Sequence, residues 1–464
     1  MSIYRPCSIR GDADHDLSEE LYRRWGYALG HEVEPGDKFI VGGDVRRSTP
    51  PLQAALADGL CLAGVDCIDL GELPTPLVYH AKRRLRAAAC AIVTASHHPS
   101  EQNGLVWMLG NRPPCPEQIE KLRQAADRPV PASPDRPKTS PRLLDTSFDY
   151  VASLQETWCE AMRASQHIVL DLMHGCWSGR ARRYLHAIFP ACLISVVRDG
   201  CDPDFGGRSP DCSQSEQLDE LCERVHRERA HLGIAFDGDG DQIALVDGRG
   251  APLSVEETTW VLLRSLGRKL RGQPVLYDQK LSDRVPEMVR RFGAEPLVQP
   301  SGTAHFHGQM LETGAIFGVH SHGHYYFGDL DGDADALYTA CRIIAYLAEP
   351  GKQLDQLRRR CPKVFMTPDI PLQVPADAGD QLLNTLRTAW SGFPQCTLDG
   401  LRIDLPGGWA LVRSAPDEPA LTFRFESLDW PALDETVRRV CATLPDEVRT
   451  SLWSRYEFAM GRGE

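Results

Sequence analysis

The segment Leu232–Val246 reads LGIAFDGDGDQIALV, an acidic glycine-rich loop between two apolar runs. Short apolar runs on both sides of such a loop are typical of two buried strands joined by a tight turn. Asp237, Asp239 and Asp241 stand two residues apart, and like charges so close resist joint ionisation unless a cation compensates them. Carboxylates favour Mg²⁺ or Ca²⁺, and glycines let the backbone fold around a small ion. We therefore predict a metal site; the alternative is an acidic turn.

Strand and helix patterns alternate on the N-terminal side of this loop. Short apolar runs occupy 38–44, 65–71 and 87–93, and a helical pattern fills 50–63. This alternation is typical of a mostly parallel sheet covered by helices. Ligands of such sheets bind beyond the carboxyl ends of the strands, so we expect functional residues in the loops that follow them.

The same pattern divides the chain into domains. A Pro- and Ser-rich stretch at 128–142 indicates a boundary, new apolar strands open at Ile168 and Pro274, and the segment around Cys361 has the character of a hinge. We expect an α/β fold, with sheet-and-helix domains over 1–148, 149–251 and 252–362 and a smaller C-terminal α+β domain over 363–464.

The composition is that of an ordinary globular protein. The chain has 464 residues, with 42% apolar residues, 25% charged residues and a net charge of −13. The acidic balance argues against a nucleic-acid partner, because phosphate binding needs clustered Lys and Arg. No apolar run is long enough for a membrane helix, and the N-terminal residues lack a basic-then-apolar signal pattern. We expect a soluble, cytoplasmic protein without a membrane partner, and its 15 cysteines as reduced thiols.

A second polar loop follows the apolar run 87–93. It reads Thr94-Ala95-Ser96-His97-His98-Pro99. A serine on a loop at the end of a strand, with histidines beside it, is exposed where a nucleophile would be. A polar turn without catalytic function is an equally good interpretation of this loop alone.

Taken together, the two loops resemble the phosphoserine loop and the metal loop of the α-D-phosphohexomutases, the phosphomannomutase/phosphoglucomutase family. Shorter matches to the family follow in the right order along nearly the whole chain. They lie at Tyr4–Gly11, Gly43–Arg46, Pro74–Pro76, Glu312–His324 and Arg413–Glu426.

The resemblance implies a heart-shaped molecule with a central cleft, built from three sheet-and-helix domains of related topology and a small C-terminal domain. It also implies that phosphate moves between the 1- and 6-positions of a hexose phosphate, mannose or glucose, through a phosphoserine and a bisphosphosugar. Ser96 would carry the phosphoryl group, and Mg²⁺ would be held by Ser96, Asp237, Asp239 and Asp241.

The resemblance gives further residues a role. Arg10 would stabilise the moving charge, His97 would orient the serine loop, and His324 would act near the reacting hydroxyl. His320 and His322 would bind the sugar, while Arg413 and Ser414 would anchor the distal phosphate. A small phosphosugar is thus the expected partner, and the oligomeric state is not fixed.

Several positions depart from the family pattern. Val106, Gln242 and Pro300 replace cations, His320 and His322 replace Glu and Ser, and Ala415 and Asp417 replace hydroxyl residues. The phosphoryl-transfer centre is thus kept while the substrate-binding loops are rebuilt. Three functions stay open: a mutase, a relative with another substrate or with phosphatase or phosphotransferase activity, and a non-catalytic paralogue that binds or regulates.

Two other clusters have alternative interpretations. His305, His307, His320, His322 and His324 form either a transition-metal site or hydrogen-bonding substitutes in a sugar loop. The acidic segment 329–335 lacks the Gly and Glu of a calcium loop. We interpret it as a solvated acidic turn.

Overall fold

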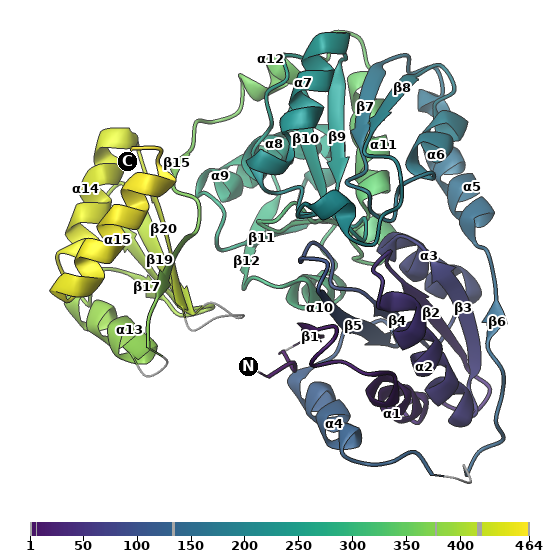
Figure 1. The fold of residues 1–464 in the computed structure, drawn as a ribbon. Helices are drawn as coiled ribbons and strands as arrows, with labels where there is room; N and C mark the ends of the chain where they lie inside the picture. The colour runs from purple at the N-terminus through teal and green to yellow at the C-terminus, as the bar shows by residue number, and fades with distance from the viewer. Residues whose placement is uncertain (1, 6, 132–134, 376–377, 415–419, 463–464) are drawn as a thin grey trace.

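The structure, a computed structural model, describes residues 2–5, 7–131, 135–375, 378–414 and 420–462. Its strands form four sheets in these residues. Figure 1 shows them as successive units along the chain, from the N-terminal unit in purple to the C-terminal unit in yellow. The predicted α/β class is confirmed.

The first sheet has the order β1-β5-β4-β2-β3-β6. Strand β2 is parallel to β3 and β4, while β5 runs antiparallel to β4 and β1. The predicted strands and helix of this region are confirmed. Its elements are β1 (Ile9–Asp12), α1 (Glu19–Gly30), β2 (Lys38–Gly43), α2 (Thr49–Leu62), β3 (Asp66–Glu72), α3 (Thr75–Leu85), β4 (Ala89–Val93), β5 (Gln102–Leu109), α4 (Pro116–Ala126) and β6 (Arg142–Leu143).

The second sheet has the order β10-β9-β7-β8, with only β10 antiparallel to its neighbour. The two strands predicted around the acidic loop are β9 and β10, and Phe236 pairs with Ile243 across it. The elements of this unit are α5 (Ser147–Thr157), β7 (His167–Asp171), α6 (Ala181–Ile188), β8 (Leu193–Val197), α7 (Asp219–Glu228), β9 (Leu232–Phe236) and β10 (Ile243–Asp247).

The third sheet repeats this plan with the order β12-β11-β13-β14, and β14 is its antiparallel edge strand. Its elements are α8 (Val255–Leu266), β11 (Pro274–Asp278), α9 (Arg284–Arg291), β12 (Glu295–Gln299), α10 (Thr303–Thr313), β13 (Phe317–Val319), β14 (Tyr325–Phe327), α11 (Ala336–Leu347) and α12 (Leu354–Arg358). Single 3₁₀ turns lie at Cys159–Ala161, Phe205–Gly207, Ser215–Gln217, Gly267–Leu270 and Gly328–Leu330.

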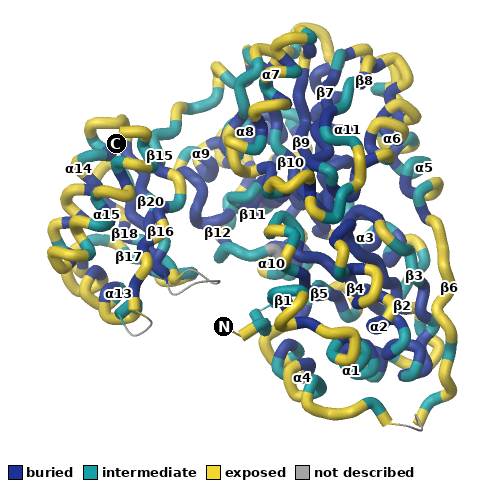
Figure 2. Tube along the Cα trace, viewed as in Figure 1, coloured by how far each residue is buried: buried dark blue, intermediate teal, exposed yellow. Residues whose placement is uncertain are grey.

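In each of these three sheets one hairpin joins two antiparallel strands: β4–β5, β9–β10 and β13–β14. Hairpin connections are too short for a parallel crossover, which is why the otherwise parallel sheets are mixed. One apolar core runs through all three units, and includes Ile92, Phe236 and Val319 from the three hairpins. Figure 2 shows it as buried chain in dark blue.

The fourth sheet is entirely antiparallel and belongs to a smaller α+β unit with its own apolar core. Figure 1 shows this unit to one side of the others, next to the third sheet. Its elements are β15 (Phe365–Met366), β16 (Ile370–Gln373), α13 (Ala378–Ala389), β17 (Gln395–Cys396), β18 (Leu401–Leu405), β19 (Gly408–Ser414), β20 (Ala420–Ser427), α14 (Trp430–Cys441) and α15 (Asp446–Ala459). The domain bounds and the central cleft stay predictions.

The acidic segment 329–335 is only in part the solvated turn that we predicted, because Asp329 and Asp331 are exposed but the other two aspartates are not. Asp333 and Asp335 are buried. Asp335 accepts hydrogen bonds from the backbone N–H of Tyr338 (2.9 Å), where it caps α11, and from the Tyr150 hydroxyl. Asp333 pairs with Arg83 of α3. Acidic composition alone did not reveal these long-range partners.

Among the described residues, no helix is both long and apolar enough to cross a membrane. The expected cytoplasmic location stays a prediction.

The turn between β9 and β10 is fixed by close backbone contacts. Gly240 has φ +83, and a Cβ there would lie 2.3 Å from Trp177 Nε1. That indole N–H donates a hydrogen bond to the Gly240 carbonyl at 2.9 Å. The backbone N–H of Cys176 donates to the Gly238 carbonyl at 2.9 Å. Both glycines are required by close approach, since a Cβ at Gly238 would lie 2.8 Å from the Ser96 carbonyl oxygen.

We predict that Gly240→Ala lowers the midpoint of thermal unfolding, followed by circular dichroism, clearly more than Gly36→Ala does. Both residues have φ +83, but nothing lies within 4 Å of a Cβ at Gly36. Gly36→Ala should therefore cost only the ~1–2 kcal/mol of left-handed strain, whereas Gly240→Ala adds overpacking of about 1–3 kcal/mol. Equal shifts in the two variants would show that the Trp177 contact is not constraining.

Candidate active site and metal centre

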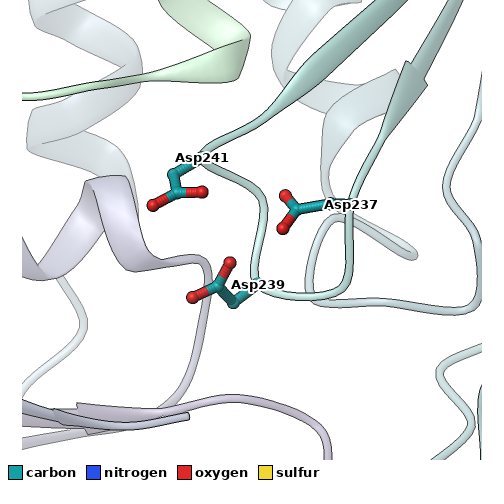
Figure 3. A group of neighbouring side chains, drawn as sticks. All are labelled: Asp237, Asp239 and Asp241. Carbon is teal, nitrogen blue, oxygen red and sulfur yellow. The ribbon is translucent and has the colours of Figure 1, made fainter. Parts of the chain in front are cut away.

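Three carboxylates share the loop between β9 and β10. Figure 3 shows the side chains of Asp237, Asp239 and Asp241 gathered around this single turn. One oxygen from each lies within 4.8 Å of the others. Asp237 and Asp239 are buried, and the Asp241 side chain is 15% exposed. The structure thus forms the cluster that the sequence predicts.

The donor set fits a hard divalent cation. Asp239 Oδ1 is buried and has no hydrogen-bond partner among the described residues, and Asp241 Oδ1 makes no hydrogen bond there either, although His324 Nε2 lies 3.1 Å from it. Burial, and after it the charge of Asp241, raises the pKa of Asp239 to about 7. Burial also raises the pKa of Asp241 to about 7, against the charge of Arg10. Carboxylates that are this reluctant to ionise together, with an unpartnered oxygen on Asp239, suit a cation such as Mg²⁺.

Asp237 links this loop to the serine loop. Its Oδ1 accepts the backbone N–H groups of Gly240 and Gln242, both at 3.0 Å. Its Oδ2 lies 3.3 Å from Ser96 Oγ. A Cβ on Gly238 would lie only 2.8 Å from the Ser96 carbonyl oxygen, so the backbones of the two loops also touch.

Ser96 follows β4 and has φ 52, in the left-handed region. Its N–H donates to Thr94 Oγ1 at 2.8 Å. Its Oγ lies 3.1 Å from Nδ1 of His97, so the imidazole of the next residue is within hydrogen-bonding distance of the serine hydroxyl. The Thr94 hydroxyl is shared between Asp44 (2.8 Å) and Asp239 (3.1 Å), which ties the serine loop to the metal loop.

Arg46 holds the serine loop through hydrogen bonds to its backbone, a role that sequence reasoning did not assign. The side chain is fully buried and pairs with Asp44 at 2.9 Å. Its guanidinium donates to the carbonyl oxygens of Ser96 (2.8 Å) and His98 (2.7 Å). The available signal was a polar Asp-x-Arg at the end of an apolar strand.

Arg10 lies on β1, opposite Gly104 of β5. Burial lowers the pKa of His97 to about 4, and the charge of Arg10 adds to the effect. The same charge acts on Asp241. Arg10 is therefore near both predicted loops. Val106 lies on β5 and pairs with Ile92 of β4.

The third hairpin completes the site. Its residues His320, His322 and His324 lie between β13 and β14. His324 Nε2 is 3.1 Å from Asp241 Oδ1. The backbone N–H of Ile243 donates to the Gly323 carbonyl at 3.1 Å, so this hairpin is hydrogen-bonded to the end of the metal loop.

The other two histidines of the hairpin have different neighbours. The His322 and His97 rings lie 5.8 Å apart between centroids. His320 Nε2 is 3.2 Å from the Gly302 N–H and 3.4 Å from Asp278 Oδ2. Burial lowers the pKa of His320 to about 3 and of His324 to about 4. These imidazoles are therefore neutral at physiological pH.

The five histidines of the proposed transition-metal site are not brought together. His305 is exposed on α10, and His307 faces the Asn111 carbonyl (2.8 Å) and Asp333 (3.2 Å) instead. In the described part of the chain, the one group of His, Cys, Asp or Glu placed to hold an ion is the aspartate triad. The structure therefore gives the transition-metal interpretation no support.

Two cationic side chains, Arg413 and Lys280, lie where the third and fourth units meet. Arg413 on β19 pairs with Asp399 at 2.7 Å, and Asp399 also accepts the Ser301 N–H at 3.0 Å. Lys280, which sequence reasoning missed, is buried and pairs with Asp369. Both charges contribute to the low pKa of His320, after burial. They therefore lie near the third hairpin.

Ser414 is the last residue of β19 and is exposed. Ala415 and Asp417 lie outside the described residues.

Comparison with protein families gives one consistent match. The models described as Phosphoglucomutase/phosphomannomutase, alpha/beta/alpha domains I, II and III, match residues 5–129, 148–250 and 256–365 in that order. Together they cover well over half of the chain.

Individual proteins agree with these matches. A phosphomannomutase/phosphoglucomutase of Pseudomonas aeruginosa is 28% identical over 431 residues, covering 92% of each chain. A solved Phosphoglucomutase/phosphomannomutase family protein from Burkholderia thailandensis has a TM-score of 0.84 and 28% identity, covering 100% of this chain and 98% of that one.

A more distant structure shares the fold. It is the N-acetylphosphoglucosamine mutase of Aspergillus fumigatus in complex with GlcNAc-6P and magnesium, with a TM-score of 0.61, 14% identity and coverage of 97% and 96%. The three matched models and the full-length relatives show that this chain belongs to the phosphoglucomutase/phosphomannomutase family, the α-D-phosphohexomutases.

Proposed function

We propose that this chain is an intramolecular phosphotransferase that moves phosphate between the 1- and 6-positions of a hexose phosphate, mannose or glucose. The observation that carries the proposal is the 3.3 Å approach of Ser96 Oγ to Asp237 Oδ2, across 141 residues of sequence. A hydroxyl that touches a cation-binding triad is placed to be a phosphoryl acceptor.

In the proposed reaction Ser96 carries the phosphoryl group, and His97, whose Nδ1 lies 3.1 Å from Ser96 Oγ, orients the serine loop. Asp237, Asp239 and Asp241 would hold Mg²⁺ together with an oxygen of Ser96. The proposal is supported by the buried Asp239 Oδ1, which has no hydrogen-bond partner among the described residues, and by the magnesium in the Aspergillus fumigatus relative. When bound, Mg²⁺ would neutralise charge on the moving phosphoryl group.

Other residues bind and orient the substrate in this proposal. Arg10 supplies a fixed positive charge beside Asp241. His324, oriented by its contact with Asp241, lies near the reacting hydroxyl, and His320 and His322 offer neutral ring nitrogens to sugar hydroxyls. Arg413 and Ser414 anchor the phosphate that is not transferred.

The first test is mutase turnover. We expect wild-type protein with Mg²⁺ and a sugar bisphosphate activator to convert mannose 1-phosphate or glucose 1-phosphate in a coupled assay. Ser96→Ala should reduce this rate by at least about 10³-fold, because it removes the nucleophile. Intact mass should show phosphate on wild type and none on Ser96→Ala.

Ser100→Ala, in the same loop, is the matched control and should retain both signals. Full turnover in Ser96→Ala would mean that another residue is the nucleophile. A wild type that is phosphorylated but never isomerises a sugar would favour the phosphatase or phosphotransferase alternative.

The second test uses the raised pKa values of Asp239 and Asp241, both about 7 without a cation. A carboxyl whose pKa is raised by folding stabilises the fold most below its unfolded value, 3.8, and this contribution is lost as the pH rises through about 7. We expect metal-free protein to lose thermal stability between about pH 5 and pH 8.

Mg²⁺ should restore that stability far more at about pH 8 than at about pH 6, because binding requires ionised carboxylates. Thermal unfolding with and without Mg²⁺ at each pH measures the effect. Asp239→Asn should abolish most of the rise in unfolding temperature that Mg²⁺ causes. An unchanged rise in this variant would place the cation elsewhere.

A further inference from the structure

Asp399 lies where the third and fourth units meet, in the loop between β17 and β18. Its Oδ2 is 2.7 Å from Nη2 of Arg413 and accepts the backbone N–H of Ser301 at 3.0 Å. The Arg413 and Asp399 side chains are only 15% and 24% exposed, so solvent ions screen the pair weakly. A carboxylate of the chain itself thus occupies the guanidinium to which the proposed function assigns a phosphate.

The backbone around Asp399 is held in place from both sides. The next residue, Gly400, has φ +84, and a Cβ there would lie 2.3 Å from the Val412 carbonyl oxygen and 2.7 Å from Arg413 Cγ. On the other side, the carbonyl oxygen of Asp399 accepts a hydrogen bond from the Gln279 side chain of the third unit. This packing keeps the carboxylate beside Arg413.

Arg413 uses only part of its donor capacity in this contact. In the described part of the chain, its Nε is buried without a hydrogen-bond partner, and its one ion-pair partner is Asp399. The neighbouring Arg424, by contrast, pairs with Asp369 (3.1 Å) and also donates to the Lys280 carbonyl (2.9 Å). Because a guanidinium binds phosphate best through two parallel N–H groups, Arg413 has more to gain than Arg424 from a new anionic partner.

A phosphate and Asp399 cannot both use this guanidinium at low cost. Phosphate oxygens bound to Arg413 would stand close to Asp399 Oδ2, and like charges in a partly buried site repel. An exchange of partners avoids this repulsion, because Arg413 turns to the phosphate while Asp399 keeps the Ser301 N–H as a donor. The geometry therefore favours replacement of the carboxylate over addition of the phosphate.

We propose that Asp399 is an internal competitor of the phosphate, which occupies Arg413 in the free protein and lowers the affinity of this site for an anion. This inference rests on the role of Arg413 in the proposed function. Asp399 then sets how tightly the distal phosphate is held, although it makes no contact with the phosphate itself.

The rival interpretation is that Asp399 orients Arg413 for the phosphate and so raises the affinity. The two interpretations predict opposite effects when the charge of Asp399 is removed. Asp399→Asn is the suitable change, because asparagine keeps the shape and its carbonyl oxygen can still accept the Ser301 N–H.

The experiment measures dissociation constants by isothermal titration calorimetry, with glucose 1-phosphate and, in parallel, inorganic phosphate. It compares wild type, Asp399→Asn, Arg413→Gln and the double variant. We expect Asp399→Asn to bind both anions at least about tenfold more tightly than wild type, because the charged hydrogen bond that competes is lost. In the Arg413→Gln background the same change should have no effect, since the competition acts through Arg413.

Asp404→Asn is the matched control. Asp404 is also a carboxylate of the fourth unit paired with an arginine, Arg402 at 3.0 Å, but it lies opposite Trp409 on β19 and not beside Arg413. This variant removes the same charge and should bind both anions as wild type does. Thermal unfolding of every variant checks that the fold is kept.

Three results would overturn the inference. The first is an affinity of Asp399→Asn that is equal to or weaker than that of wild type. The second is a gain that persists in the Arg413→Gln background or also appears in Asp404→Asn. The third is that neither wild type nor Asp399→Asn binds either anion, because Arg413 would then not be an anion site.

The proposed function is judged separately, by mutase turnover of wild type. A protein that shows the expected gain with inorganic phosphate but turns over no hexose phosphate would keep the role of Asp399 and lose the proposed function. Turnover by wild type together with an unchanged affinity in Asp399→Asn would mean the reverse.

Discussion

Three carboxylates held out of water within 4.8 Å of one another are the constraint that organises this molecule. Like charges at that separation repel strongly in a low-dielectric site, so each needs its own partners. The partners come from different sheets: backbone N–H groups of the loop itself at Asp237, Thr75 and Thr94 of the first sheet at Asp239, and His324 of the third sheet at Asp241. The metal loop is thus the junction of three units.

Strands of the first two units and the turn between β9 and β10 could be predicted from sequence, because apolar runs that end in Gly and polar residues are local signals. The serine, metal and histidine loops occupy the equivalent hairpin of three similar sheets. Their meeting point is not local, since Ser96 and Asp237 are 141 residues apart, and only the family resemblance supplied it. Arg46 and Lys280 were missed because a lone cation after a strand does not reveal its buried partner.

The departures from the family pattern gain a physical interpretation from these contacts. Around Ser96 the structure places an amide at Gln242 and neutral imidazoles at His97 and His322. Hydrogen bonds between neutral groups are weaker than charge-assisted ones, and they weaken steeply when their angle is poor. A site of this kind relies on the exact orientation of its donors more than on fixed charge, which explains why the loop that carries Gln242 is held so tightly by Trp177 and by the third hairpin.

The fourth unit differs from the others in how it is attached. Its apolar core is separate, and its seam with the third unit consists of polar contacts. Arg402 and Arg424 donate to backbone carbonyls at Gln279 and Lys280 (3.2 and 2.9 Å), and Asp399 bridges Arg413 and Ser301. The seam also includes the pair of the buried Lys280 with Asp369, so the fourth unit is attached through polar contacts, whereas the first three units share an apolar core. Since Asp399 already pairs with Arg413, an anion that binds Arg413 competes directly with a contact that holds the fourth unit in place.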